Sequence, residues 1–394
     1  MAGWCPAQHR PPSTPGAAAL ASSTLDRLVA DTPSSRDRVV DFARGFAICV
    51  VVLWHWTLSV THRTGDDSLT MANPIHVVPG GWLMTWVLQV MPVFFLAGGY
   101  ANLTGWVGAR ERGERAGTFI STRLRRLLIP TAVWAAIWLS AEVVTLLVRD
   151  EHRWMWQWFP GYLIPLWFIG VYAVLILLVP ITARLHERGG LGVLAGLVVL
   201  VVVGSVLDRG LDWSWAGWVN AGFVWILIHQ LGYAWRTWDL GHRPLMQRVA
   251  IAVVGLGTLV VLTGSGAYAS SMVATVEGDS NILPTNATIV ALAVFQLGLL
   301  VSLTPWLERV LQRPGVWKPV VAVNAVAMTI FSWHMSALLV TIWMYEGLGH
   351  QLMDEPTASW WAQRWLWLLA PLVVLAALIA AFGRIEFAAR RSRR

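Results

Sequence analysis

Long apolar stretches recur along the whole chain and restrict its fold more than any other feature. Each is about 20 residues long, the length that crosses roughly 30 Å of hydrocarbon as an α-helix. The sequence is 56% hydrophobic and 13% charged, against roughly 25% charged residues in a soluble domain. We therefore predict an all-α, polytopic membrane protein of about ten transmembrane helices. The predicted spans are 39–60, 82–105, 127–148, 162–183, 190–207, 217–235, 248–268, 286–305, 319–345 and 361–383.

The basic residues fall into alternate loops and predict the orientation of the chain. Loops rich in arginine or lysine stay in the cytoplasm, so both termini are expected there and the plasma membrane is the expected location. We predict a disordered cytoplasmic tail over 1–36, a membrane domain over 37–384 and a basic cytoplasmic tail over 385–394. The formal net charge of +7 arises mainly from these loops. It therefore does not indicate nucleic-acid binding, and we expect the lipid bilayer and no nucleic acid as a partner.

The first predicted span carries two ionisable residues, Arg44 and His55. They are eleven positions apart, which puts them about 20° apart around a helix and about 16 Å apart along it. A guanidinium can hold phosphates, and a neutral imidazole can act as a general base. An extended ligand with phosphates at one end and a reactive carbonyl at the other, such as acyl-coenzyme A, could bridge the two positions.

Structural interpretations of both residues stay open at this point. Arg44 could reach the cytoplasmic headgroups or pair with Asp41. His55 could be an interfacial polar residue between two tryptophans. Asp41 could equally orient Arg44 within a site.

Several segments resemble the integral-membrane acyltransferase-3 family in the same order along the chain. RGFAICVVVLWH, residues 44–55, fits the family's Arg-x10-His signature, and DFARG resembles its opening Asp-x-x-Arg-Gly phrase. MPVFFLAGGYAN is similar to its Phe-Phe-x-x-Ser-Gly segment, with Ala97 in place of the usual serine. RLRRLLIP, LWFIGVY and SWHM resemble later family segments. The resemblance covers roughly residues 36 to 384.

The resemblance implies transfer of an acyl group, often acetyl, from cytoplasmic acyl-CoA to a hydroxyl of a glycan, a lipid-linked sugar or a small molecule. His55 resembles the family's catalytic histidine, and Arg44 its partner arginine. Arg123 and Arg126 resemble basic residues that meet the CoA phosphates. Acyl-CoA would be a donor substrate, so no permanently bound cofactor is expected. No residue cluster has metal-ligand spacing, so no metal is expected either.

Further polar or aromatic residues in the spans are candidates for the substrate cavity. Gly98 could let backbone approach a ligand, or serve close helix packing. Glu142 could orient a histidine, contact an acceptor or lie at the outer interface. His334 lies in the middle of a span, where a lone histidine needs a partner, and could contact a substrate or be packed structurally. The candidates are Asp41, Phe94, Phe95, Gly98, Glu142, Trp167 and His334.

An alternative function is a transporter or flippase that uses Arg44 and His55 as substrate or coupling groups. Transporters often contain two matching halves. A five-plus-five division would pair the first span with AGFVWILIHQLGYAWR, which lacks the Arg-x10-His pattern. A homo-oligomer, or a separate extracytoplasmic protein that relays the acyl group, remains open.

Overall fold

The computed structural model describes residues 26–27, 29–30, 36–148, 157, 159–273 and 280–391. Most of the predicted N-terminal tail and the last three residues lie outside the described residues. The elements are α2 (Arg38–Thr57), β1 (Val60–Arg63), β2 (Leu69–Ala72), η1 (Pro74–Val77), α3 (Trp82–Leu88), α4 (Met91–Glu111), α5 (Ala116–Val148), η2 (Pro160–Leu163), α7 (Ile164–Gly189), α8 (Leu191–Gly210), α9 (Ser214–Thr237), η3 (Leu240–His242), α10 (Leu245–Gly264), α11 (Ala287–Leu311), α12 (Pro314–Ala325), α13 (Ala327–Gly347), α14 (Ala358–Ala362) and α15 (Arg364–Arg391).

The predicted all-α membrane fold is confirmed. A helix covers each of the ten predicted spans, and within the described ranges nine helical segments are long and apolar enough to cross a membrane. The predicted span 217–235, which corresponds to α9, is not among the nine. This helix buries the polar side chains of Asn220, His229 and Gln230 against its neighbours. The cytoplasmic placement of the termini stays a prediction.

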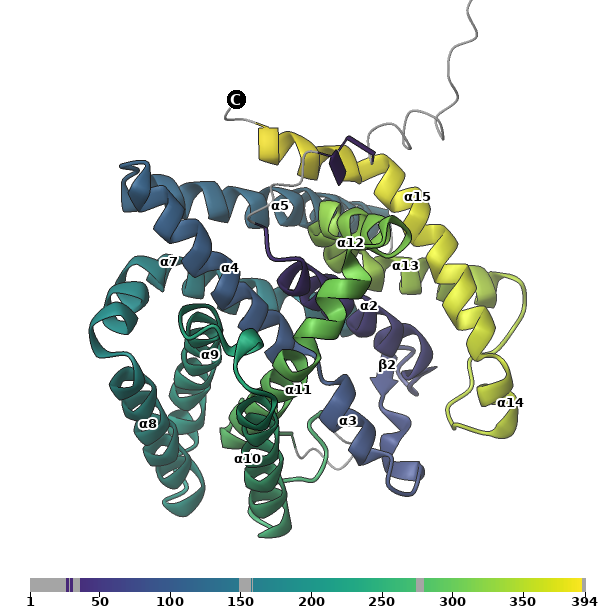
Figure 1. The fold of residues 1–394 in the computed structure, drawn as a ribbon. Coiled ribbons are helices and arrows are strands. Elements are labelled where there is room, and N and C mark those ends of the chain that lie inside the picture. The colour runs from purple at the N-terminus through teal and green to yellow at the C-terminus, as the bar shows by residue number, and fades with distance from the viewer. Residues whose placement is uncertain are drawn as a thin grey trace, which may run out of the picture.

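Helix α2 lies in the middle of the bundle, with α4, α11, α12 and α13 beside it (Figure 1). Helices α4 and α13 are mostly buried, whereas α5, α8, α10 and α15 expose most of their apolar side chains. In a membrane such side chains face lipid, which is as apolar as they are. The central position of α2 places its polar residues inside the protein.

Most predicted spans differ from the observed helices at their ends, and three of the differences concern the candidate site or the predicted tail. Helix α5 begins at Ala116 instead of residue 127, so the arginines expected beside the span lie on the helix itself. The span 319–345 is broken at Val326 into α12 and α13. Helix α15 continues to Arg391, into the stretch expected to be a tail.

The second span is interrupted before Pro92 and not at the glycine pair. Helix α3 ends at Leu88, and α4 begins at Met91. A Cβ on Gly99 would lie 2.1 Å from the carbonyl oxygen of His229 on α9, and one on Gly98 would lie 2.8 Å from the ring of Tyr172. These glycines therefore allow close packing of helices, which is the structural alternative raised by the sequence.

The loop after α2 forms a β-hairpin that the sequence analysis did not predict. Strands β1 and β2 pair antiparallel, with Val60 opposite Ala72. The Arg63 guanidinium donates two hydrogen bonds to Glu346 on α13, at 2.7 and 2.8 Å. These hydrogen bonds raise the pKa of Arg63. The fork geometry of a guanidinium fits a carboxylate, so this pair holds the hairpin against the end of α13.

Candidate functional site: two chambers along one helix

A cavity of about 570 Å³ lies around the first half of α2 and is called the arginine chamber. Its side chains come from α2, α4, α5, α7, α9, α12, α13 and α15. Five arginines line it, against three carboxylates. The charged lining residues are Arg36, Asp37, Asp41, Arg44, Arg123, Arg126, Arg236 and Glu386.

The three carboxylates are all engaged with other protein groups. Asp37 caps the start of α2 by accepting from the backbone N–H groups of Val39 and Val40. Asp41 pairs with Arg36, so the expected pairing with Arg44 is not what the structure contains. Glu386 accepts from the N–H groups at the start of α13. Because five arginines line the chamber against three carboxylates, its lining has a net positive charge that favours an anionic ligand.

Arg44 carries a buried donor that faces the arginine chamber without a partner in the described part of the chain. It is half-buried, and its Nε is buried with no hydrogen-bond partner within the described residues. Coulombic repulsion links it to Arg123, so the two guanidinium groups share one region. A buried donor without a partner costs about 1–3 kcal/mol, and a bound phosphate oxygen would remove that cost.

Arg123 is positioned by a glycine that the sequence analysis missed. Its Nη2 donates to the carbonyl oxygen of Ala101 at 3.2 Å. A Cβ at Gly105 would lie 1.8 Å from the same nitrogen, so only glycine leaves room for the guanidinium against α4. Arg126, one turn further along α5, also lines the arginine chamber, whereas Arg125 does not.

A second cavity of about 840 Å³ surrounds the other end of α2 and is called the histidine chamber. The β-hairpin, the start of α7 and the residues before α11 form much of its wall. Its lining residues are Val51, Trp54, His55, Ser59, His62, Thr64, Thr70, Met71, Ala72, Asn73, Leu88, Gln89, Met91, Ile164, Trp167, Val273, Ser280, Ile282, Leu283, Phe331 and His334.

His55 and His334 meet inside the histidine chamber, although 279 positions separate them in sequence. His55 Nδ1 lies 2.9 Å from His334 Nε2, and the rings stack with centroids 5.2 Å apart. His334 Nδ1 lies 2.7 Å from the carbonyl oxygen of Phe331. The sequence analysis named both histidines but did not pair them.

These contacts assign the proton positions in the two neutral rings. A carbonyl oxygen only accepts, so His334 Nδ1 carries a proton, and its Nε2 is left with a lone pair. That lone pair accepts from His55 Nδ1, which leaves the lone pair of His55 on Nε2. Within the described residues His55 Nε2 has no hydrogen-bond partner. It is therefore the ring nitrogen that can take a proton from a ligand in this chamber.

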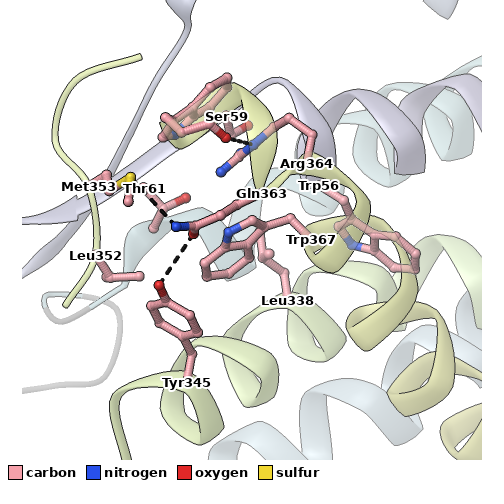
Figure 2. A pocket seen from close by; sticks show the side chains of 11 residues that line it. Trp56, Ser59, Thr61, Leu338, Tyr345, Leu352, Met353, Gln363, Arg364 and Trp367 are labelled. Atoms are coloured by element: carbon pink, nitrogen blue, oxygen red, sulfur yellow. Dashed lines mark hydrogen bonds between the residues drawn. The ribbon is translucent and has the colours of Figure 1, made fainter. Parts of the chain in front are cut away.

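A tryptophan behind the histidine pair fixes the backbone that carries His334. Trp56 is 2% exposed, and its indole N–H donates to the carbonyl oxygen of His334 at 3.0 Å. A cavity of about 20 Å³ lies beside Trp56. Figure 2 shows its lining residues, among them Arg364, whose guanidinium lies over the rings of Trp360 and Trp367. This space holds about one water molecule. It is too small for a substrate.

A constriction separates the two chambers. It is formed by Ala47, Ile48, Val51, Met91, Phe94, Phe168 and Phe331, and it holds no volume for a water molecule. It shares Phe94 with the arginine chamber and Phe331 with the histidine chamber. The rings of Phe94 and Phe168, and those of Phe168 and Phe331, pack edge to face with centroids 4.8 Å apart. Arg44 and His55 lie on one helix as expected, but the path between them is closed.

Three of the predicted cavity residues line neither chamber. Phe95 is fully buried against Trp225, Gly98 packs on Tyr172, and Glu142 is buried within α5. Among the described residues, no group of three or more His, Cys, Asp or Glu side chains could hold a metal ion.

Comparison with known protein families gives a match across most of the chain. The model of the acyltransferase 3 family, described as an acyltransferase domain, matches residues 37–383. No curated protein and no solved structure matches the sequence. The matched range begins at the N-cap of α2 and ends within α15, so it includes the histidine chamber and all lining residues of the arginine chamber except Arg36 and Glu386.

Proposed function

The chain belongs to the acyltransferase 3 family and is a membrane-bound acyltransferase, and we propose that it moves an acyl group, such as acetyl, from acyl-CoA to a hydroxyl of a glycan or small molecule. Family membership makes the chain an enzyme, so the transporter alternative has no support. The observation that carries the proposal is the arrangement along α2, where Arg44 faces a cationic chamber and His55 faces a second chamber with an oriented lone pair.

In this proposal the arginine chamber holds the phosphates of the donor. Coenzyme A carries several phosphate charges, and guanidinium groups bind phosphate with paired hydrogen bonds. The chamber is lined by Arg44, Arg123, Arg126 and Arg236. In this proposal, these four arginines form the site that binds the phosphates of the donor.

The thioester then has to reach His55 through the constriction. Arg44 and His55 are about 16 Å apart along the helix, and the flexible pantetheine arm of CoA is an extended chain. Because the constriction is closed, the rings of Phe94, Phe168 and Phe331 must separate when the donor binds.

At His55 the proposed chemistry is general-base catalysis. Nε2 takes the proton from the acceptor hydroxyl while the hydroxyl oxygen attacks the thioester carbonyl. A C–O bond forms, the C–S bond breaks, and the thiolate receives that proton to leave as free CoA. His334 accepts the Nδ1 proton of His55 and so keeps Nε2 of His55 available as the base. Transient transfer of the acyl group to His55 itself would use the same nitrogen.

The test is the release of free thiol from acetyl-CoA by the protein in nanodiscs, with a crude extract of envelope lipids and glycans as the acceptor pool. His55→Ala should abolish release because the proton acceptor is lost. Arg44→Ala should raise the KM for acetyl-CoA by about tenfold or more, since one charge-assisted contact contributes about 1.5–3 kcal/mol. His350→Ala and Arg309→Ala are matched controls, because both residues are exposed and line neither chamber.

Two outcomes would contradict different parts of the proposal. Wild-type activity in His55→Ala would show that the base is another group. If acetyl-CoA is not cleaved and CoA does not raise the Tm, the donor assignment is wrong, because a ligand that binds only the folded state must stabilise it.

A further inference from the structure

The histidine chamber carries information about the acceptor, and this inference rests on the proposed acyl transfer. Its volume of about 840 Å³ lies in the upper part of the range for small-molecule pockets, about 300–1,000 Å³. A site that only had to admit the end of a hydroxyl group would not need this size. The chamber therefore has room for the body of the acceptor as well.

The inner wall of the histidine chamber is apolar and aromatic. Side chains from five different segments meet around His55, and none of them can form an ion pair. These wall residues are Val51, Trp54, Leu88, Met91, Ile164, Trp167 and Phe331. Met71, Ile282 and Leu283 add to the apolar surface of the chamber. An apolar ligand body would gain about 25 cal/mol for each Å² removed from water here.

The polar groups of the chamber are neutral hydrogen-bonding groups. Among its described lining residues there is no carboxylate, lysine or arginine; the polar side chains are hydroxyls, amides and imidazoles. Most hydroxyls already have partners, as Thr70 has in the ring of His62 at 3.2 Å. A charged ligand would lose its hydration without gaining a counter-charge from this wall.

Two tryptophans of this apolar wall, Trp54 and Trp167, carry indole N–H groups. Within the described residues, neither Trp54 nor Trp167 has a hydrogen-bond partner for its indole nitrogen. An indole N–H only donates, so it suits an ether, carbonyl or hydroxyl oxygen. The two chambers thus have opposite chemistry: the arginine chamber suits an anion, and the histidine chamber suits an uncharged molecule with a few oxygen atoms.

We propose that the acceptor is a neutral amphiphilic alcohol, whose uncharged apolar body fills the histidine chamber while one hydroxyl reaches His55. Glycosides of apolar compounds have this chemistry. Acceptors that would carry phosphate or carboxylate groups into the chamber do not fit it. Sugars linked to a lipid through a diphosphate belong to this excluded class.

Three soluble glucosides with the same sugar hydroxyls test the proposal. Phenyl β-D-glucopyranoside is neutral with an apolar group, 4-carboxyphenyl β-D-glucopyranoside adds one charge, and methyl β-D-glucopyranoside lacks the apolar group. Binding to the protein in nanodiscs is measured by equilibrium dialysis, with empty nanodiscs subtracted, and acetyl transfer by mass spectrometry. We expect the phenyl glucoside to bind at least about tenfold more tightly than the other two, since an unpaired charge or a lost apolar group costs more than 1.4 kcal/mol.

A pair of variants at Thr70 tests whether the probe lies in this chamber. Thr70 lines the chamber from β2 and is half-buried. Thr70→Arg adds a cation to the wall and should raise the affinity for the carboxyphenyl glucoside relative to the phenyl glucoside. Thr70→Gln is the uncharged control for the larger side chain and should leave that ratio near the wild-type value.

The results separate failure of this proposal from failure of the proposed function. Binding of the charged or the methyl glucoside as tight as that of the phenyl glucoside overturns the acceptor class, and so does a lack of saturable binding of the phenyl glucoside. An unchanged ratio in Thr70→Arg overturns the location. Because these are binding measurements, they decide the acceptor class even if acetyl-CoA is not cleaved. Whether the donor assignment is wrong is decided by a separate observation, the absence of thermal protection by CoA.

Discussion

Replacing His334 by alanine tests whether the histidine pair orients the catalytic base. The change removes the ring nitrogen that accepts the His55 Nδ1 proton at 2.9 Å. An orphaned buried donor costs about 1–3 kcal/mol, and His55 can escape this cost by moving the proton to Nε2, the nitrogen needed for catalysis. If that whole cost falls on the transition state, kcat/KM for the acceptor drops by about 5- to 150-fold.

His334→Gln is the matched variant, because a glutamine side-chain oxygen can lie near the position of Nε2 and accept the same proton. Both variants are assayed for thiol release at saturating acetyl-CoA with the same acceptor pool, and their Tm values are compared. Glutamine should recover most of the activity that alanine loses. The KM for acetyl-CoA should stay near the wild-type value in both, since His334 does not line the arginine chamber.

Two results would refute this reasoning. Equal losses in the alanine and glutamine variants would mean that His334 acts through packing and not through its acceptor nitrogen. Full activity in His334→Ala would mean that the orientation of His55 is set by another group.

Other predictions follow from close approaches and one titrating group. Gly105→Ala should push the Arg123 guanidinium away, because a Cβ at this position would lie 1.8 Å from Nη2 of Arg123. We expect the KM for acetyl-CoA to rise about tenfold with little change in Tm. An unchanged KM would contradict a role for Arg123 in binding the donor. Gly99→Ala places a methyl group 2.1 Å from a carbonyl oxygen of α9 and should destabilise the protein by about 1–3 kcal/mol. Gly117→Ala is the control and should not lower the Tm, because its methyl group meets nothing within 4 Å. Similar Tm values for the two variants would refute close packing at Gly99. The hydrogen bond to Asp239 raises the pKa of His242 above 6.5. The stabilisation by protonated His242 should therefore be complete below about pH 6.5 and disappear as the pH rises through the folded-state pKa. The Tm difference between wild type and His242→Gln should shrink from about pH 6 to about pH 9. A constant difference would exclude a contribution of His242 protonation to stability.

Much of the fold was accessible from sequence because each helix has a local cause. Apolar runs long enough to span a bilayer predicted where the helices lie, and a helix is present at every predicted span. The placement of Arg44 and His55 on one helix likewise depends only on helical geometry. Both residues line cavities, one at each end of α2.

The boundaries were less accessible where structure overrides hydropathy. The break at Val326 lies in a stretch that is apolar on both sides of a single polar residue, Asn324, and one polar residue does not end a hydropathy span. The hairpin after α2 contains turn residues at Gly65 to Asp67, but its strands are only four residues each. Gly105 could have been noticed as a small residue facing another helix, yet its role depends on Arg123, which comes from α5.

The sequence by itself determined that this chain spans a membrane through a helix bundle and carries an arginine and a histidine on one side of its first helix. Tertiary structure alone decided that His55 meets His334, that three phenylalanines close the path from Arg44, and that the two ends of α2 face chambers of opposite chemistry. The physical reason is that helix formation follows from local hydropathy and backbone hydrogen bonds. Helix pairing in lipid depends on close packing and a few polar contacts, which relate residues far apart in sequence and leave no periodic pattern in either segment.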